Sequence, residues 1–146
     1  MTCRQCEGIE RLFDESVANR DLKSYRKKGP SKTTQVLIDA IKSRGVEGKT
    51  LLDIGGGVGV IQHELLKAGA RSSTSVDAST AYIQAAKEEA QRQGHSERIA
   101  QHHENFVDIA QSVQPANIVT LDRVICCYHD VVKLVGQSSE RATELY

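Results

Sequence analysis

The chain has 146 residues, of which 39% are hydrophobic and 26% are charged, and its 19 basic and 19 acidic side chains leave a formal net charge of zero. These values are ordinary for one globular domain and give no global sign of nucleic-acid or membrane binding. No apolar run is long enough to cross a bilayer, and the N-terminus lacks the apolar core of a signal peptide. We therefore expect a cytoplasmic protein whose four cysteines are thiols.

The cysteines form two pairs with different spacing. Cys3 and Cys6 form a C-x-x-C pair, whereas Cys126 and Cys127 are adjacent. Adjacent side chains on a strand point to opposite faces, so the second pair is not expected to bind one ion. Because a structural zinc site needs about four ligands, we expect no metal site. Zinc binding and redox chemistry at the C-x-x-C pair are the alternatives.

A basic stretch follows the first predicted helix. Apolar residues at helical spacing predict an amphipathic helix over residues 7–19, and residues 20–32 are then basic apart from Asp21. This stretch is either a solvated face, a grip in which Tyr25 and Arg26 hold a carboxylate over the next loop, or a nucleic-acid patch. The scarcity of aromatic residues beyond Tyr25 argues against the third interpretation.

A glycine-rich loop follows a short apolar run that predicts a buried strand over residues 50–54. The loop contains four glycines, Gly55, Gly56, Gly57 and Gly59. Glycines let the backbone turn sharply against a ligand, and the next helix presents unpaired N–H groups and its positive dipole end. This order is typical of nucleotide sites in doubly wound α/β folds. The dinucleotide pattern G-x-G-x-x-G fails, because its third glycine falls at Val60 or Gln62.

Further strands and helices alternate after this loop. Residues 73–76 predict a strand that ends at Asp77, followed by a helix over residues 79–93 and strands at 98–102 and 116–121. An acid about twenty residues beyond the loop is where such folds bind ribose hydroxyls, since a carboxylate accepts two hydrogen bonds. Its alternative role is a helix N-cap. The alternation predicts a parallel sheet with right-handed crossovers.

Two motifs carry a resemblance to a known family. Asp53 stands two residues ahead of Gly55 and completes D-x-G-x-G-x-G, and residues 121–128 read LDRVICCY. The chain resembles class I S-adenosylmethionine-dependent methyltransferases of the small-molecule type, in particular a bacterial subgroup with LLDIGGGVG and LDRVxCCYPD. The resemblance extends over nearly the whole chain and implies S-adenosyl-L-methionine as the cofactor.

The resemblance also implies which residues bind that cofactor. The glycine loop faces the methionine part, Asp77 holds the ribose, and Asn105 stands where the family usually has an acid for the adenine amino group. Phe106 would offer its backbone N–H to the adenine. The implied cofactor-binding residues are Asp53, Gly55, Gly56, Gly57, Gly59, Asp77, Ala78, Asn105, Phe106 and Asp122, to which the basic stretch adds Tyr25 and Arg26.

The expected reaction is methyl transfer to a small-molecule acceptor, in which the protein mainly holds the nucleophile in line with the methyl group. If a base is needed, His129 is the first candidate and Asp122 or Asp130 the next. Tyr128 is expected to place its ring near the sulfonium. His129 replaces the proline of the subgroup, and the absence of an N-P-P-Y motif argues against DNA amino methylation.

The predicted sheet is shorter than that of the family, which has seven strands, whereas about four are predicted here before a last helix over residues 139–146. We therefore expect a doubly wound, mostly parallel sheet without its C-terminal strands. Residues 1–146 would form one domain, with a helical cap over 1–45 and a partial α/β core over 46–146. The fourth strand would be an exposed apolar edge through which two copies pair.

Three other functions stay open. The first is a cofactor-binding module without activity of its own. The second is a nicotinamide-dependent oxidoreductase in which Asp77 would also bind the ribose, and the third is an RNA methyltransferase that uses residues 20–32. The broken dinucleotide pattern argues against the second, and the neutral net charge against nucleic acid as a partner.

Overall fold

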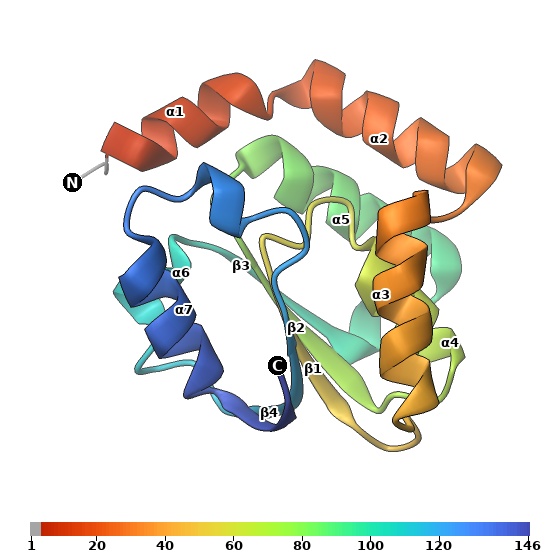
Figure 1. Ribbon diagram of the computed structural model, residues 1–146. Helices are drawn as coiled ribbons and strands as arrows, with labels where there is room; N and C mark the ends of the chain where they lie inside the picture. Colours follow the sequence, from red (N-terminus) through yellow and green to blue (C-terminus); the bar gives the residue numbers. More distant parts are fainter. Residues whose placement is uncertain (1–3) are drawn as a thin grey trace.

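Residues 4–146 are described by a computed structural model, in which three helices precede alternating strands and helices (Figure 1). The helices are α1 (Arg4–Leu12), α2 (Glu15–Lys28), α3 (Lys32–Ser43), α4 (Val60–Lys67), α5 (Thr80–Gln93), α6 (Phe106–Ile109) and α7 (Val131–Ser139). The strands are β1 (Thr50–Ile54), β2 (Ser72–Asp77), β3 (Ile99–His103), β4 (Ala116–Thr120) and β5 (Ala142–Leu145). Two 3₁₀ turns are η1 (Ser96–Arg98) and η2 (Ile125–Cys127). In this part of the chain, no helix is long and apolar enough to span a membrane.

The five strands form one sheet in the order β3-β2-β1-β4-β5, and every neighbouring pair is parallel. The central strand is β1, whose Leu52 aligns with Thr74 of β2 on one side and with Val119 of β4 on the other. The prediction of a parallel, doubly wound α/β sheet is confirmed. All carboxyl ends of the strands meet at one edge, which is where such folds place their ligand site.

Helices cover both faces of the sheet. The side chains of β1 are therefore buried on both sides. Successive side chains of a strand point to opposite faces. Leu51 accordingly packs with Ile38 of α3 in one core, and Leu52 packs with Phe106 and Leu134 in the other. Figure 1 shows α3 and α4 on one side of the sheet and α6 and α7 on the other.

The fifth strand corrects the prediction for the C-terminal residues. Residues 139–146 do not form a helix, because α7 ends at Ser139 and β5 follows. β5 pairs with β4 through Ala116 with Ala142 and Ile118 with Leu145, so β4 is not an edge of the sheet. Any pairing of two copies through this side would therefore involve β5. A strand this short shows too little periodicity to be recognised without its neighbour.

The N-terminal region has two helices where one was predicted over residues 7–19. The chain breaks after Leu12, and Asp14 caps α2 by accepting a hydrogen bond from the backbone N–H of Val17 at 3.1 Å. Figure 1 shows α1 and α2 lying across the top of the sheet, over its glycine loop. The buried Leu22 and Tyr25 of α2 pack there with Val58 and Ala85, in a third core.

Candidate functional site

The glycine loop between β1 and α4 has a backbone that other residues adopt with strain. Gly55, Gly57 and Gly59 have φ values of 66°, 55° and 91°, in the left-handed region. Gly56 is limited by space instead, because a Cβ there would lie 2.5 Å from Nε2 of Gln62 and 2.6 Å from Oδ2 of Asp53. The four glycines thus allow a close turn over a buried polar pair.

Asp53 lies beneath this loop and is 1% exposed. Its Oδ1 accepts a hydrogen bond from Oγ1 of Thr120 at 2.7 Å, and its Oδ2 accepts one from Nε2 of Gln62 at 2.9 Å. Burial raises the pKa of this carboxyl to about 6, although the two hydrogen bonds act in the opposite direction. Asp53 therefore supports the loop by linking β1, β4 and α4.

Asp77 closes the opposite side of the loop from the end of β2, where it is 7% exposed. Its Oδ2 accepts from the backbone N–H of Gly57 at 3.0 Å, and its Oδ1 accepts from that of Ser79 at 2.8 Å. Burial raises the pKa of the Asp77 carboxyl, against both backbone hydrogen bonds. The N-cap of α5 is Ser79, which accepts from the N–H of Tyr82 at 3.1 Å, so the alternative cap role does not fall to Asp77.

The loops after β3 and β4 meet beside this pair. The phenol of Tyr128 donates a hydrogen bond to Oδ1 of Asn105 at 3.1 Å, and the amide of Asn105 donates to Oδ2 of Asp108 at 3.1 Å. Asp122, two residues beyond the end of β4, accepts from Oγ1 of Thr34 at 2.7 Å and is thereby tied to the first turn of α3. The loops after β3 and β4 and the glycine loop after β1 therefore converge on one region.

These loops, together with α1 and α2, enclose a pocket of about 560 Å³. This volume is within the roughly 300–1,000 Å³ of small-molecule sites. The predicted site residues that line it are Tyr25, Asp53, Gly55, Gly56, Gly57, Asp77, Ala78, Asn105, Phe106, Asp122 and Tyr128. Gly59, Arg26, His129 and Asp130 are not among its lining residues.

The structure does not bring Arg26 to the glycine loop. Its Nε donates to Oε2 of Glu89 at 2.7 Å and its Nη2 to Oε1 of Glu88 at 3.0 Å, so it faces α5. The phenol of Tyr25 donates to Oε1 of Glu64 at 2.7 Å, and burial raises its pKa. Helix geometry explains the difference, because adjacent residues of a helix point in different directions. From the same helix, Arg20 lines the pocket instead.

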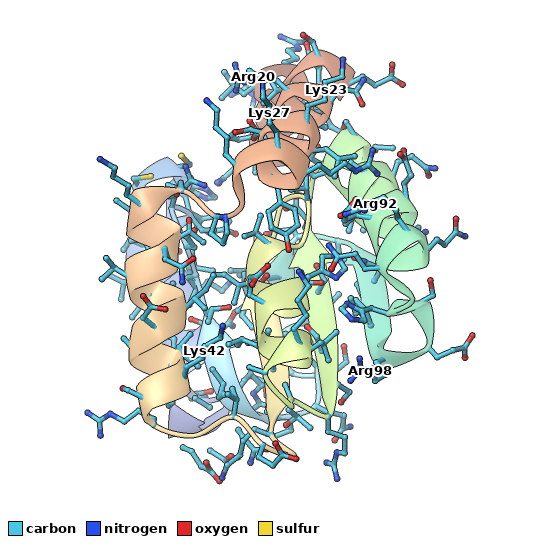
Figure 2. All side chains as sticks on the ribbon, turned by 90° about the vertical axis from the view of Figure 1, so that its right-hand side faces the viewer. Arg20, Lys23, Lys27, Lys42, Arg92 and Arg98 are labelled. Carbon is cyan, nitrogen blue, oxygen red and sulfur yellow. The ribbon has the colours of Figure 1, made fainter. Side chains whose placement is uncertain are left out.

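The rest of the basic stretch forms an exposed face. Figure 2 shows Lys23 and Lys27 at the outer side of α2, and both are exposed. This agrees with a solvated helix face, the first of the three interpretations of residues 20–32.

His129, the first candidate base, lies outside the pocket. It is exposed, and its ring stacks on that of Tyr128 with centroids 5.1 Å apart. It lines a separate shallow groove between α1 and η2, together with Leu12. The turn at Arg123, whose φ is 59°, and the following 3₁₀ turn direct this segment outward, which a strand-based interpretation does not anticipate.

Several lining residues were missed by the sequence analysis. Ile9 and Phe13 come from α1 and the turn after it, and the ring of Phe13 packs against that of Tyr82 of α5 in a tilted arrangement, with centroids 5.4 Å apart. The phenol of Tyr82 donates to Oδ2 of Asp21 at 2.6 Å and so links α5 to α2. Val124 packs against Gly55, where a Cβ would collide with it. The sequence showed the apolar stripe of the first helix, but it did not show that this stripe lines the pocket.

The order of the strands, the glycine loop after β1 and the acid at the end of β2 define an α/β fold of the S-adenosyl-L-methionine-dependent methyltransferase class. A Methanococcus maripaludis protein described as such a methyltransferase superposes with a TM-score of 0.76 at 19% identity, over 89% of this chain and 59% of that one. Magnesium protoporphyrin IX methyltransferase from Synechocystis, solved with bound S-adenosylmethionine, gives 0.73 at 18% identity, over 97% and 74%.

The model of the ribosomal protein L11 methyltransferase (PrmA) family matches residues 28–140, and the chain belongs to this family. The enzyme of that name from Pectobacterium atrosepticum is 33% identical over 93 residues, which are 62% of this chain and 32% of the relative. That from Yersinia pestis is 38% identical over 71 residues, 49% and 24% respectively. The matched regions span a third or less of these relatives. The small-molecule subgroup predicted from the motifs is not supported by these matches.

Proposed function

We propose that this chain binds S-adenosyl-L-methionine in the pocket at the carboxyl edge of the sheet and takes part in methyl transfer to a protein. The observation that carries the proposal is the pairing of Asp77 with the glycine loop across this pocket, through the hydrogen bond from the N–H of Gly57. A buried carboxylate facing a helix-capping glycine loop is the arrangement that holds a nucleoside in folds of this kind.

The residues present fit this cofactor. Its ribose has two adjacent hydroxyls, and the carboxylate of Asp77 has acceptor capacity for both. Its adenine needs a mostly apolar slot with a few polar groups, which Phe106 at 3% exposure and the Asn105 amide supply. The glycine loop lines the pocket with the backbone of Gly55, Gly56 and Gly57, which carry no side chains. When bound, the cofactor supplies an electrophilic methyl group on a sulfonium.

We assign two further polar residues of the pocket, Asp122 and Tyr128, to orienting the acceptor. Asp122 lines the pocket and is held by Thr34, so its carboxylate has a defined position from which it can accept a proton. Tyr128 lines the same region and is held by Asn105. His129 is left out of this assignment, because it lines the outer groove.

A protein is proposed as the acceptor because the relatives are named for methylation of a ribosomal protein. Incubating the chain with recombinant ribosomal protein L11 and methyl-labelled S-adenosylmethionine tests this directly. Label in the protein supports a protein acceptor. If cofactor binds but no label is transferred, the chain is a binding module without activity of its own.

Calorimetric titration with S-adenosylmethionine tests the cofactor site. We expect micromolar binding that weakens at least about tenfold in Asp77→Asn, which removes the charge but keeps an acceptor oxygen. Glu97→Ala, an exposed acid in η1 away from the pocket, is the matched control and should bind normally. Equal affinity in Asp77→Asn and wild type, or tighter binding of a nicotinamide dinucleotide, would contradict the proposal.

A further inference from the structure

The turn after β4 brings two thiols into contact. Cys126 and Cys127 lie in η2, and their Sγ atoms are 3.4 Å apart. Both residues are exposed and neither is in a disulfide. The expectation that adjacent cysteines diverge assumed a strand, whereas a 3₁₀ turn places both side chains on the same side here. Both also line the cofactor pocket and the groove beside it.

The backbone holds this pair in position. The N–H of Cys127 donates to the carbonyl of Val124 at 3.0 Å, and the thiol of Cys126 approaches the carbonyl of Arg123 at 3.6 Å. From α1, the amide of Gln5 donates to the carbonyl of Cys127 at 3.3 Å. The turn is thus fixed at its start by Val124 and at its end by α1. Two thiols that are already close lose little conformational entropy on chelating one ion.

The separation of the two sulfur atoms selects a coordination geometry. With metal–sulfur bonds of about 2.3 Å, two sulfurs 3.4 Å apart subtend about 95° at the ion. A tetrahedral zinc ion would need them about 3.8 Å apart, and it would need about four ligands. Among residues 4–146, no group of three or more His, Cys, Asp or Glu side chains is arranged to hold a metal ion.

We propose that Cys126 and Cys127 form a dithiol site for a trivalent, thiophilic metalloid of the arsenic(III) class at the entrance to the cofactor pocket. Such an ion carries a lone pair, is pyramidal with angles near the one above, and binds two thiolates strongly. Soft sulfur ligands prefer soft ions over the hard cations that bind oxygen.

The binding step is an exchange without oxidation or reduction. The pKa of the Cys127 thiol is raised by its hydrogen bond with Cys126. With phenylarsine oxide, both S–H bonds break, two As–S bonds form, and the oxygen leaves with the two protons as water. The product is a cyclic dithioarsenite that includes both side chains and the peptide between them.

Intact-mass spectrometry with phenylarsine oxide on the reduced full chain tests the site, together with a count of reactive thiols. We expect one adduct per chain and the loss of two thiols. The adduct should be retained in the double variant Cys3→Ser, Cys6→Ser, and its affinity should fall at least about tenfold in Cys126→Ser and in Cys127→Ser. The double variant is the matched control, because it removes the other cysteine pair.

Two outcomes would overturn the proposal. One is an adduct that persists in Cys126→Ser or disappears in the Cys3→Ser, Cys6→Ser variant, which would place the site at the N-terminal pair. The other is tighter binding of zinc than of the arsenical, measured by competition. Circular dichroism of each variant shows whether it is folded, and exposed serines are not expected to disturb η2. The readout does not depend on S-adenosylmethionine.

Discussion

Gly56 shows how a single residue determines the shape of the site. Its neighbours in the loop are needed for their left-handed backbone, but Gly56 is needed because Asp53 and Gln62 occupy the space of a side chain. The carboxylate of Asp53 is buried and held by two hydrogen bonds, so it has no free direction in which to move. A methyl group at this position must displace either the polar pair or the loop.

We predict that Gly56→Ala lowers the free energy of unfolding by about 1–3 kcal/mol and abolishes cofactor binding. Gly136→Ala is the control, since Gly136 lies in α7 with no atom within 4 Å of an added Cβ. There, alanine should raise helix stability by about 0.5–1 kcal/mol. Urea unfolding and calorimetry measure both effects, and similar stability changes in the two variants would contradict the steric argument.

A pair of buried histidines lies behind the same loop. Nδ1 of His63 is 2.8 Å from Nδ1 of His95, so one ring donates and the other accepts. Burial lowers the pKa of His63 to about 4, and the proximity of His95 contributes in the same direction. Protonating both rings would break this hydrogen bond and place two positive charges next to each other. The pair lies under the turn at Gly59, where an added Cβ would be 3.3 Å from the His63 ring.

The pH dependence of stability should reveal His63. The unfolded chain binds its proton near pH 6.5 and the folded chain only near pH 4, so the free energy of unfolding falls as the pH is lowered through this window. The Asp53 carboxyl, with its pKa raised to about 6, acts in the opposite direction. We therefore predict that the decrease in the free energy of unfolding on acidification is smaller in His63→Gln than in wild type by roughly 1–3 kcal/mol. Urea unfolding between pH 4 and 7, with exposed His129→Gln as control, measures it; identical slopes would contradict the prediction.

At the scale of elements, one buried acid joins two helices over the site. The side chain of Glu89 in α5 is 0% exposed and accepts from Arg26 of α2 at 2.7 Å and from Arg92 at 2.6 Å. Its pKa is lowered to about 2, because these donors outweigh the cost of burial. A buried acid that loses one partner keeps its desolvation cost, so α2 depends on this contact for its position over the pocket.

We predict that Arg26→Gln lowers the free energy of unfolding by about 1–3 kcal/mol and speeds hydrogen exchange in α2. Arg20→Gln is the control on the same helix, because the side chain of Arg20 is 72% exposed and its contact to Asp21 is at 3.4 Å. Its effect on stability should be within about 0.5 kcal/mol. Equal losses in the two variants, measured by urea unfolding, would show that Glu89 does not anchor α2.

At the scale of the whole molecule, β5 covers the backbone of β4, which would otherwise be an edge of the sheet. It pairs with β4, whose Ile118 and Val119 are almost fully buried, and Lys49 reaches Glu144 at 2.6 Å from the loop before β1. Without this strand, the backbone donors and acceptors of β4 would be exposed beside an apolar surface.

We predict that deleting residues 142–146 lowers the free energy of unfolding by more than about 2 kcal/mol and causes concentration-dependent association. Glu144→Gln, which removes only the ion pair with Lys49, is the control and should remain like wild type. Light scattering and urea unfolding measure the two properties. A truncated chain that stays monomeric and stable would contradict the role given to β5.

Local patterns in the sequence were sufficient for the alternating strands and helices, the glycine loop after β1 and the acid at the end of β2. These features depend on neighbours within a few residues, because side-chain periodicity and glycine backbone freedom are local properties. They placed eleven of the fifteen predicted site residues in one pocket, since parallel strands bring their carboxyl ends to the same edge.

Only the tertiary structure decided what depends on partners distant in the sequence. β5 forms because β4 offers it a ladder, Arg26 turns to α5 because Glu89 is buried there, and His129 leaves the pocket because the turn after β4 directs it outward. The contact of Cys126 with Cys127 likewise comes from a 3₁₀ turn that no local sequence pattern predicted. Such directions are set by packing between elements, which a linear pattern does not contain.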